Sequence, residues 1–199
     1  MSPRNDEQNA MIKDERREQI LSAALKVFAT RGFAATKISD IVAKGGMSHG
    51  LLYHYFKSKE EIFFELVHRA FSASGESLLM MEGMPVSPLQ KVRETAKYIL
   101  GGIDQWEDTS YYFLIVIHAS LMEMTFEEKE KVFGSSQVPV ESMMRILKQG
   151  QELGEIRQGD PLEMAIMFFA AIQGVAFYKL SMPNFKLPDP ELLVLMVKK

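Results

Sequence analysis

The chain has 199 residues, of which 47% are hydrophobic and 25% are charged, so it is long enough to bury one or two cores. It has no cysteine, which excludes disulfides, thiolate metal sites and a thiol nucleophile. The net charge of −3 is divided between +3 in residues 1–60 (10 Lys and Arg against 7 Asp and Glu) and −6 in residues 61–199 (13 against 19), and a basic first part is compatible with contact to nucleic acid.

The predicted elements are helical throughout, because no segment shows a sustained period-two alternation. Residues 1–12 are polar and charged and are expected to form a flexible tail. Apolar residues at helical spacing predict a first helix over residues 13–30. Thr36 is expected to cap a short second helix, which ends at Gly45 and Gly46.

Ser48 is expected to cap a third helix that reaches Tyr55, and Ser58 is expected to cap a fourth that continues towards Leu79. Residues 83–88 are rich in glycine and proline and predict a break. The remaining predicted helices cover residues 88–106, 110–124, a short stretch after Thr125, residues 140–153, residues 161–182 and a short stretch after Pro190. The sequence therefore predicts an all-α fold.

Residues 36–59 have the layout of a short helix, a tight glycine turn and a second short helix. Such a turn lets the two helices pack at a steep angle, so that the second can project into the major groove of DNA. Four apolar residues are expected to hold the pair together: Ile41, Val42, Met47 and Leu52. Five residues then lie on the exposed face and at the N-terminal end of the second helix, where they can reach phosphates and base edges: Ser48, His49, Gly50, Tyr53 and His54.

This segment resembles the DNA-binding module of the tetracycline-repressor (TetR) family. The resemblance is carried by residues 20–24, 28–33 and 51–61 and extends over about residues 13–65. It implies an N-terminal three-helix helix-turn-helix DNA-binding domain over residues 13–60. It also implies that residues 61–199 form a helical ligand-binding and dimerisation domain.

The resemblance implies DNA contacts for nine residues, which are Thr36, Lys37, Ser48, His49, Gly50, Leu51, Tyr53, His54 and Lys59. In the family, the residues at the positions of Thr36, Lys37 and Lys59 contact phosphate, and the hydroxyl at the position of Tyr53 reaches the DNA backbone. Leu51 stands where many members of the family have Thr or Ser. Its apolar side chain would either contact a thymine methyl group or contribute nothing to the recognition of the DNA sequence. An ordinary core or solvated role stays open for each of these side chains.

Aromatic residues and methionines in the second part of the chain are expected to line an effector pocket. The candidates are Trp106, Tyr111, Phe113, His118, Met122, Glu123, Met143 and Phe168. Of these, His118 and Glu123 are the candidates for polar contacts to a ligand. The alternative, that these residues are plain core at helical spacing, stays open.

The helices over residues 140–153 and 161–182 are the expected dimer interface, because the resemblance implies a four-helix bundle with a second copy. The latter helix is apolar on nearly every side, so part of its burial is expected from a partner. A two-fold dimer places two recognition helices about 34–36 Å apart and would read an inverted repeat of double-stranded DNA.

The expected function is a repressor that a small hydrophobic effector releases from its operator, through a shift of the fourth helix. An activator, a ligand-independent regulator and an adaptor that no longer binds DNA remain alternatives. An enzyme is not expected, because the sequence has no glycine-rich phosphate loop, HExxH motif or evident Ser-His-Asp grouping. No cofactor or metal is expected either. The polar N-terminus and the lack of a long uncharged apolar run predict a cytoplasmic protein without a membrane span.

Overall fold

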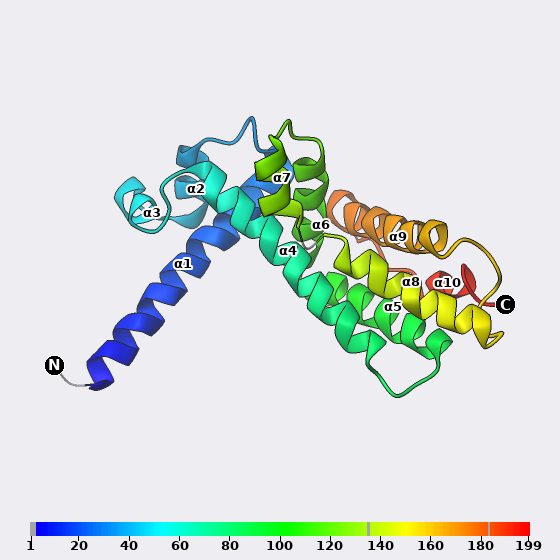
Figure 1. Cartoon of the computed structure of the whole chain (residues 1–199). Coiled ribbons are helices and arrows are strands. Elements are labelled where there is room, and N and C mark those ends of the chain that lie inside the picture. The colour runs from blue at the N-terminus through cyan, green and yellow to red at the C-terminus, as the bar shows by residue number, and fades with distance from the viewer. Residues whose placement is uncertain (1–2, 135, 183) are drawn as a thin grey trace.

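The computed structural model describes residues 3–134, 136–182 and 184–199, and within them it contains ten α-helices and no strand beyond one isolated bridge (Figure 1). This confirms the predicted all-α class. The helices are α1 (Pro3–Arg31), α2 (Ile38–Gly45), α3 (His49–Tyr55), α4 (Lys59–Glu82), α5 (Pro88–Gln105), α6 (Glu107–Ser120), α7 (Phe126–Phe133), α8 (Val138–Glu152), α9 (Pro161–Ser181) and α10 (Glu191–Leu195).

The first helix begins earlier than the sequence predicts, at Pro3 rather than Lys13. Of the expected tail, residues 1 and 2 lie outside the described residues, and residues 3–12 form the first turns of α1, which project away from the rest of the molecule (Figure 1). Residues 8–16 are exposed, so these turns depend on local helix propensity and not on packing. The prediction missed them because it relied on apolar periodicity, which an unpacked helix does not need.

Buried apolar side chains form two clusters that meet along α4. The first joins α1, α2, α3 and the first half of α4 to the end of α6, and includes Phe28, Leu52, Phe63 and Ile115. The second joins Leu78, near the end of α4, to α5, α8, α9 and α10. A continuous α4 therefore crosses the predicted domain boundary at residues 60 and 61 and belongs to both cores.

Three phenylalanine rings form the centre of the first cluster. The ring of Phe63 in α4 lies 5.1 Å from that of Phe28 in α1 and 4.9 Å from that of Phe33 in the turn after α1, measured between ring centroids. The Phe28 pair is edge-to-face, an arrangement that aromatic rings favour. Phe63 and Phe28 are completely buried, so these rings fix α4 against α1.

The sixth helix also starts earlier than predicted, at Glu107 rather than Ser110, and it ends at Ser120. Trp106 is at once the C-cap of α5 and the N-cap of α6, so the two helices follow each other without a loop. Glu107 and Asp108 lie in the first turn of α6, where negative charge is favourable beside the helix dipole.

The end of α4 is tied to α8 by an ion pair. Arg145 donates to both carboxylate oxygens of Glu82, at 2.7 and 2.9 Å, and the buried Ser142 hydroxyl donates to the same carboxylate at 2.7 Å. The hydrogen bond from Arg145, with a further one from Ser142, lowers the pKa of Glu82 below its ordinary value of 4.5. A carboxyl group whose pKa is lower in the folded state stabilises that state above its unfolded pKa.

We therefore expect the free energy of unfolding to decrease as the pH falls from about 4.5 through the lowered pKa of Glu82. The Glu82→Gln variant removes this titration, so the difference in stability between the wild type and the variant should shrink on acidification. Urea unfolding of both proteins between about pH 7 and pH 3 measures it. A difference that stays constant over this range would contradict the prediction.

The ninth helix carries an apolar face that the described part of the chain leaves exposed. By length and composition α9 could cross a membrane, although a helix from a protein core passes the same test. Its inner side packs on α6 and α8, yet only 28% of its most apolar window is buried. Five large apolar side chains are exposed along it: Leu162, Ile166, Met167, Phe177 and Tyr178.

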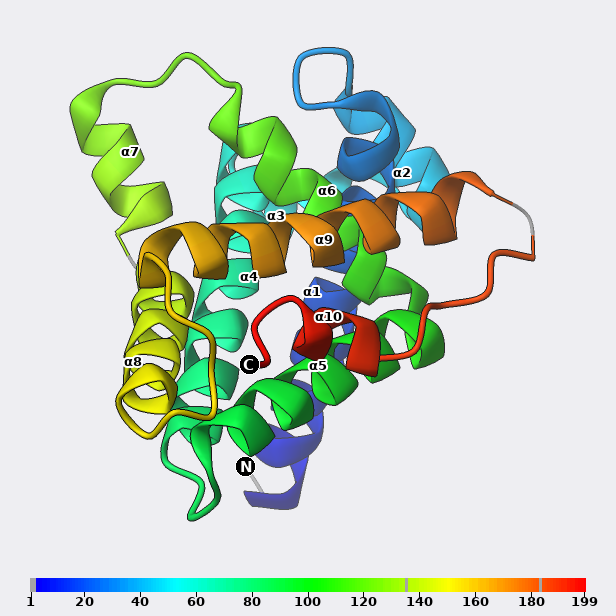
Figure 2. The same cartoon turned by 90° about the vertical axis from the view of Figure 1, so that its right-hand side faces the viewer.

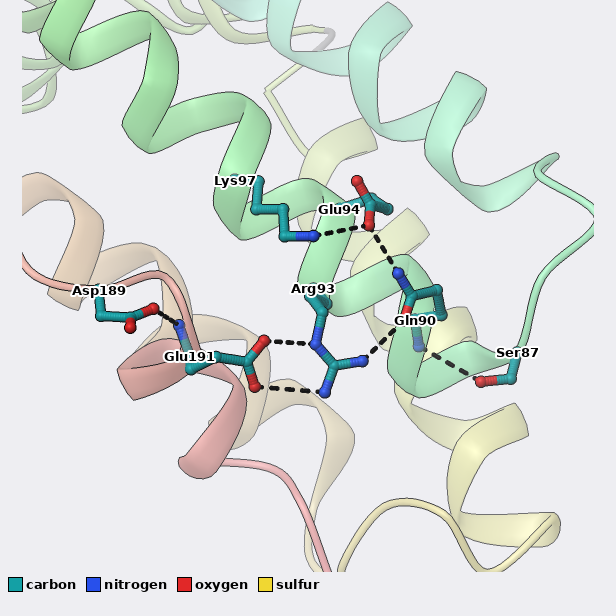
Figure 3. Close-up of polar contacts among 7 residues, drawn as sticks. All are labelled: Ser87, Gln90, Arg93, Glu94, Lys97, Asp189 and Glu191. Atoms are coloured by element: carbon teal, nitrogen blue, oxygen red, sulfur yellow. Dashed lines mark hydrogen bonds and ion pairs between the residues drawn. The ribbon is translucent and has the colours of Figure 1, made fainter.

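The chain ends in a short helix and a tail that lie against the body between α5 and α9 (Figure 2). The segment pairs with the loop after α8, because the Arg157 amide donates to the Val197 carbonyl at 2.9 Å. It also pairs with α5, because Arg93 binds the carboxylate of Glu191 with two of its nitrogen atoms (Figure 3).

Candidate nucleic-acid interface

A tight turn with left-handed backbone joins α2 to α3. Gly46 has φ +59°, which a residue with a Cβ rarely adopts. It is the C-cap of α2, and its amide donates to the Ala43 carbonyl at 3.4 Å. The Met47 amide then donates to the Val42 carbonyl at 3.1 Å. Leu52, on the inner side of α3, is completely buried, as is Ile41 of α2. The two helices therefore form the predicted helix-turn-helix.

The third helix presents its polar side chains outward. The Ser48 hydroxyl accepts a hydrogen bond from the Leu51 amide at 3.1 Å, so the predicted cap is present. Of the residues predicted to contact DNA, His49, Gly50, Tyr53 and His54 are exposed, whereas Leu51 is half-buried. Tyr53 is 54% exposed, and the ring of His54 packs edge-on to that of the half-buried Tyr55.

The start of α2 differs from the prediction. Thr36 is buried and donates its hydroxyl to the Gly32 carbonyl at 2.7 Å, so this side chain faces the interior and does not cap the helix. Lys37 holds the N-cap position, and its amide donates to the Asp40 carboxylate at 2.9 Å. Of the two residues, Lys37 alone is exposed.

Lys59 also lies differently from the expectation. Its ammonium group donates to the carbonyl oxygens of Phe33 and Thr36, each at 3.0 Å, and lies 4.3 Å from the centre of the Phe33 ring. Two of its three N–H donors are therefore used inside the module. The position at the start of α4 gives Lys59 a structural task, which is to hold the turn between α1 and α2.

Replacing these two lysines by alanine is expected to have different effects: the Lys37 variant should change the salt dependence of DNA binding, and the Lys59 variant should change stability. Lys37→Ala should lower the slope of log K against log salt concentration for a bound duplex by about 0.9, because one phosphate contact is lost. Lys59→Ala should leave the slope unchanged and lower the free energy of unfolding by about 1–3 kcal/mol. DNA titrations at several salt concentrations, with urea unfolding, measure both. If the Lys59→Ala protein is as stable as the wild type but shows a reduced salt slope for DNA binding, Lys59 contacts a DNA phosphate and the prediction is wrong.

A network of ion pairs that the sequence did not reveal fixes α4 against α1. Arg17 donates to both carboxylate oxygens of Glu65 and lies 4.9 Å from the centre of the Phe56 ring. Arg69 bridges the same Glu65 to Glu18 of α1, the latter at 2.8 Å. Partners about fifty positions apart leave no local pattern in a sequence, so only the folded chain identifies them.

The predicted effector residues do not come together into one pocket. Met143 and Phe168 are completely buried in the second core, while Glu123 and Trp106 are exposed. Met122 packs on the first core and Phe113 on the second. The reason is that residues 106–123 wind around α6 and its end, so neighbours in sequence point to different sides. A surface hollow of about 320 Å³ lies between α1, α2 and α6, and of the eight candidates Tyr111 lines it.

His118 connects α6 to the DNA-binding module. Its Nε2 lies 3.2 Å from the Ala29 carbonyl oxygen near the end of α1, and its ring lies beside Gly32. Ile115 and Ala119 of α6 are buried in the first core. This part of α6 therefore packs within the module, which the sequence did not predict.

Comparison with known proteins agrees with this geometry. The family model "Bacterial regulatory proteins, tetR family" matches residues 20–66. The chain is 29% identical over 171 residues to the uncharacterized HTH-type transcriptional regulator YfiR of Bacillus subtilis, which covers 85% of this chain and 80% of YfiR. It is 40% identical over 80 residues to YdgC of the same organism, which covers 39% of this chain but only 41% of YdgC.

Solved structures share the whole fold. AibR in complex with isovaleryl coenzyme A and operator DNA superposes with a TM-score of 0.72 at 21% identity, over 90% of this chain and 94% of AibR. The SmeT–triclosan complex superposes with a TM-score of 0.67 at 23% identity, over 93% of this chain and 92% of SmeT. At these identities the likeness concerns the fold.

The exposed α3, the capped turn before it and the helical body behind it define a helix-turn-helix DNA-binding protein. Residues 20–66 match the DNA-binding module of the tetR family of bacterial regulatory proteins, and the chain is similar over most of its length to an HTH-type transcriptional regulator.

Proposed function

We propose that this protein is a homodimeric repressor that binds an inverted-repeat operator and leaves it when a small hydrophobic effector binds the helical body. The observation that carries the proposal is the exposed face of α3, which is anchored by the buried Leu52 and presents His49, Tyr53 and His54 to solvent. Imidazole and phenol groups on such a helix can donate hydrogen bonds to base edges and phosphates.

The proposed DNA-contacting surface is smaller than the sequence predicted. It consists of Lys37, Ser48, His49, Gly50, Leu51, Tyr53 and His54. Thr36 and Lys59 support it from inside, because their polar groups are bonded to carbonyl oxygens of the α1–α2 turn. Gly50 has no side chain, and a Cβ there would meet only the Ser48 hydroxyl oxygen, at 4.0 Å, so the backbone of α3 can approach DNA closely there.

The proposed dimer forms through α8 and α9. A row of exposed apolar side chains along α9 is what a single chain would show if a second copy completed its core. The adjoining face of α8 is polar, with Glu141, Lys148 and Gln149 exposed. A two-fold arrangement pairs this face with its own copy, which gives an apolar centre and a polar rim.

The effector is proposed to be small and mainly apolar. AibR and SmeT, which share the fold, were solved with isovaleryl coenzyme A and triclosan respectively. In this chain the helical body has a continuous apolar interior, formed by α5, α8 and α9, into which such a molecule could partition. An effector can weaken DNA binding only if it binds the DNA-incompetent conformation more tightly.

Footprinting on DNA from the region upstream of its own gene tests the proposal. We expect two protected half-sites with centres about one helical turn apart, and lower transcription from the adjoining promoter in vitro. A footprint accompanied by higher transcription would identify an activator, and the absence of any footprint would leave only an adaptor. The His49→Ala variant should change the preferred half-site sequence while the protein remains a dimer.

A further inference from the structure

The C-terminal segment, here residues 191–199, occupies an apolar site on the helical body. Leu193, Val194 and Val197 are at most 4% exposed, and Leu193 and Val197 belong to the second core cluster. Most other members of that cluster come from α5, α8 and α9 and include Val92, Ala96, Leu147, Met164 and Phe168. Removal of the segment would therefore leave an apolar groove in the body. In Figure 2 the backbone of the segment lies between α5 and α9.

The polar contacts between the segment and the body lie at the two ends of the segment, while its apolar side chains are buried. At the far end, Arg157 donates its amide to the Val197 carbonyl at 2.9 Å and its Nε to the Met196 carbonyl at 2.8 Å. At the near end, Glu191 is bound by Arg93. Residues 185–189, which precede the segment, have no regular secondary structure. The segment can therefore leave as a unit without unwinding α9.

Arg93 is held in place independently of the segment. One of its nitrogen atoms donates to the side-chain oxygen of Gln90 at 2.7 Å, and Gln90 donates in turn to Glu94 at 2.6 Å (Figure 3). Its other two nitrogen atoms bind the Glu191 carboxylate, whose pKa is lowered by this hydrogen bond. If Glu191 leaves, an oriented cation remains at the mouth of an apolar groove.

We propose that residues 191–199 are a displaceable occupant of the effector site, and that the effector is an aliphatic carboxylate. Its head group takes the place of Glu191 at Arg93, and its chain takes the place of Leu193, Val194 and Val197. The segment imitates such a molecule, since it places one carboxylate within a turn of a row of aliphatic side chains. This inference rests on the proposed effector control, and it names the ligand class and the event that binding brings about.

The size of the displaced side chains sets the length of the effector. Leu193, Val194 and Val197 together contribute about ten aliphatic carbons, so a saturated chain of about that length fills the same volume. Affinity should rise by about fourfold with each added methylene and level off near ten carbons. Decanoate is therefore the probe, and 1-decanol, which has no carboxylate, should bind much more weakly.

Competition with the segment predicts opposite effects for the two partners of the ion pair. Calorimetric titration of the full chain with decanoate, in the absence of DNA, should show binding weakened roughly tenfold or more in Arg93→Ala, because the cation is lost. Glu191→Gln should bind about three- to tenfold more tightly, because the groove is open for a larger fraction of the time. A purely structural pair would change both affinities in the same direction.

The Glu82–Arg145 pair supplies the matched control, because it has the same bidentate geometry between α4 and α8. Arg145→Ala and Glu82→Gln should leave decanoate affinity unchanged. Equal effects of the two pairs would overturn the proposal, as would an Arg93→Ala protein that binds decanoate like the wild type.

Hydrogen exchange measures the displacement itself. Decanoate should speed up exchange at the amides of Arg157 and Lys199, whose hydrogen bonds to the carbonyl oxygens of Val197 and Glu155 join the segment to the body and are broken when the segment leaves. Unchanged or slower exchange at both amides with decanoate bound would overturn the proposal. The DNA footprint of the ligand-free protein is measured in a separate experiment. If that footprint is absent, the proposed DNA binding is wrong, whereas the proposal for the decanoate site is not affected.

Discussion

Ile166→Glu is expected to convert the protein into a monomer and to weaken its binding to an inverted repeat by at least about 100-fold. Ile166 is 52% exposed and belongs to the apolar row of α9. In the proposed dimer its side chain is covered by the second copy, where an unpaired carboxylate would lose its hydration at a cost of several kcal/mol. Each half-site would then be bound alone, without the gain that comes from linking two binding events.

Met80→Glu is the matched control for that change. Met80 lies on α4, is 57% exposed and is also apolar, but it is not part of the α9 row. Its replacement should leave both the dimer and the DNA affinity unchanged. Sedimentation velocity and titration of an operator fragment measure the two properties, while helical circular dichroism checks folding. A dimeric Ile166→Glu protein would show that subunits associate through another surface.

Phe63→Ala is expected to lower the free energy of unfolding by about 3–5 kcal/mol, because a buried aromatic ring is lost and a cavity remains. The ring of Phe63 lies against Phe28 and Phe33 and is completely buried. Its loss removes the contact that positions α4 against the DNA-binding module. Thermal and urea unfolding, followed by circular dichroism, measure the effect.

The neighbouring Phe64 gives the comparison for this prediction. Phe64 is half-buried at the edge of the same cluster, and its ring centroid lies 6.1 Å from that of Phe63. Phe64→Ala should therefore cost clearly less stability than Phe63→Ala. Equal losses would mean that the centre of the module is not where the three rings meet.

Much of the fold could be predicted from the sequence, because local signals mark most helix ends. Ser48 and Ser58 each accept the amide hydrogen bond that their positions predict, and Asp160 caps α9 in the same way. The helix-turn-helix was predictable because a tight turn of this kind uses a left-handed conformation, which the glycine at position 46 adopts without steric cost. These features need only a few neighbouring residues, so they are visible without knowledge of the tertiary structure.

The direction of individual side chains could not be predicted in the same way. Lys59 is a surface-type residue at a position that favours phosphate contact, yet two carbonyl oxygens of the turn between α1 and α2 receive its hydrogen bonds. Those oxygens come from residues 23 and 26 positions earlier. Phe168 and Trp106 are both large and apolar, but tertiary packing buries the one and exposes the other. Composition alone does not distinguish a pocket lining from a core.

Because α4 is one continuous helix that belongs to both cores, a tilt at one of its ends is transmitted to the other. A helix of 24 residues is about 36 Å long at 1.5 Å per residue. A tilt of about 5° at the end that Arg145 holds would move the opposite end by roughly 3 Å, close to the rise of one base pair. In the proposed dimer, a rearrangement too small to disrupt the packing of the body would thus be enough to shift the two recognition helices out of register with the major groove.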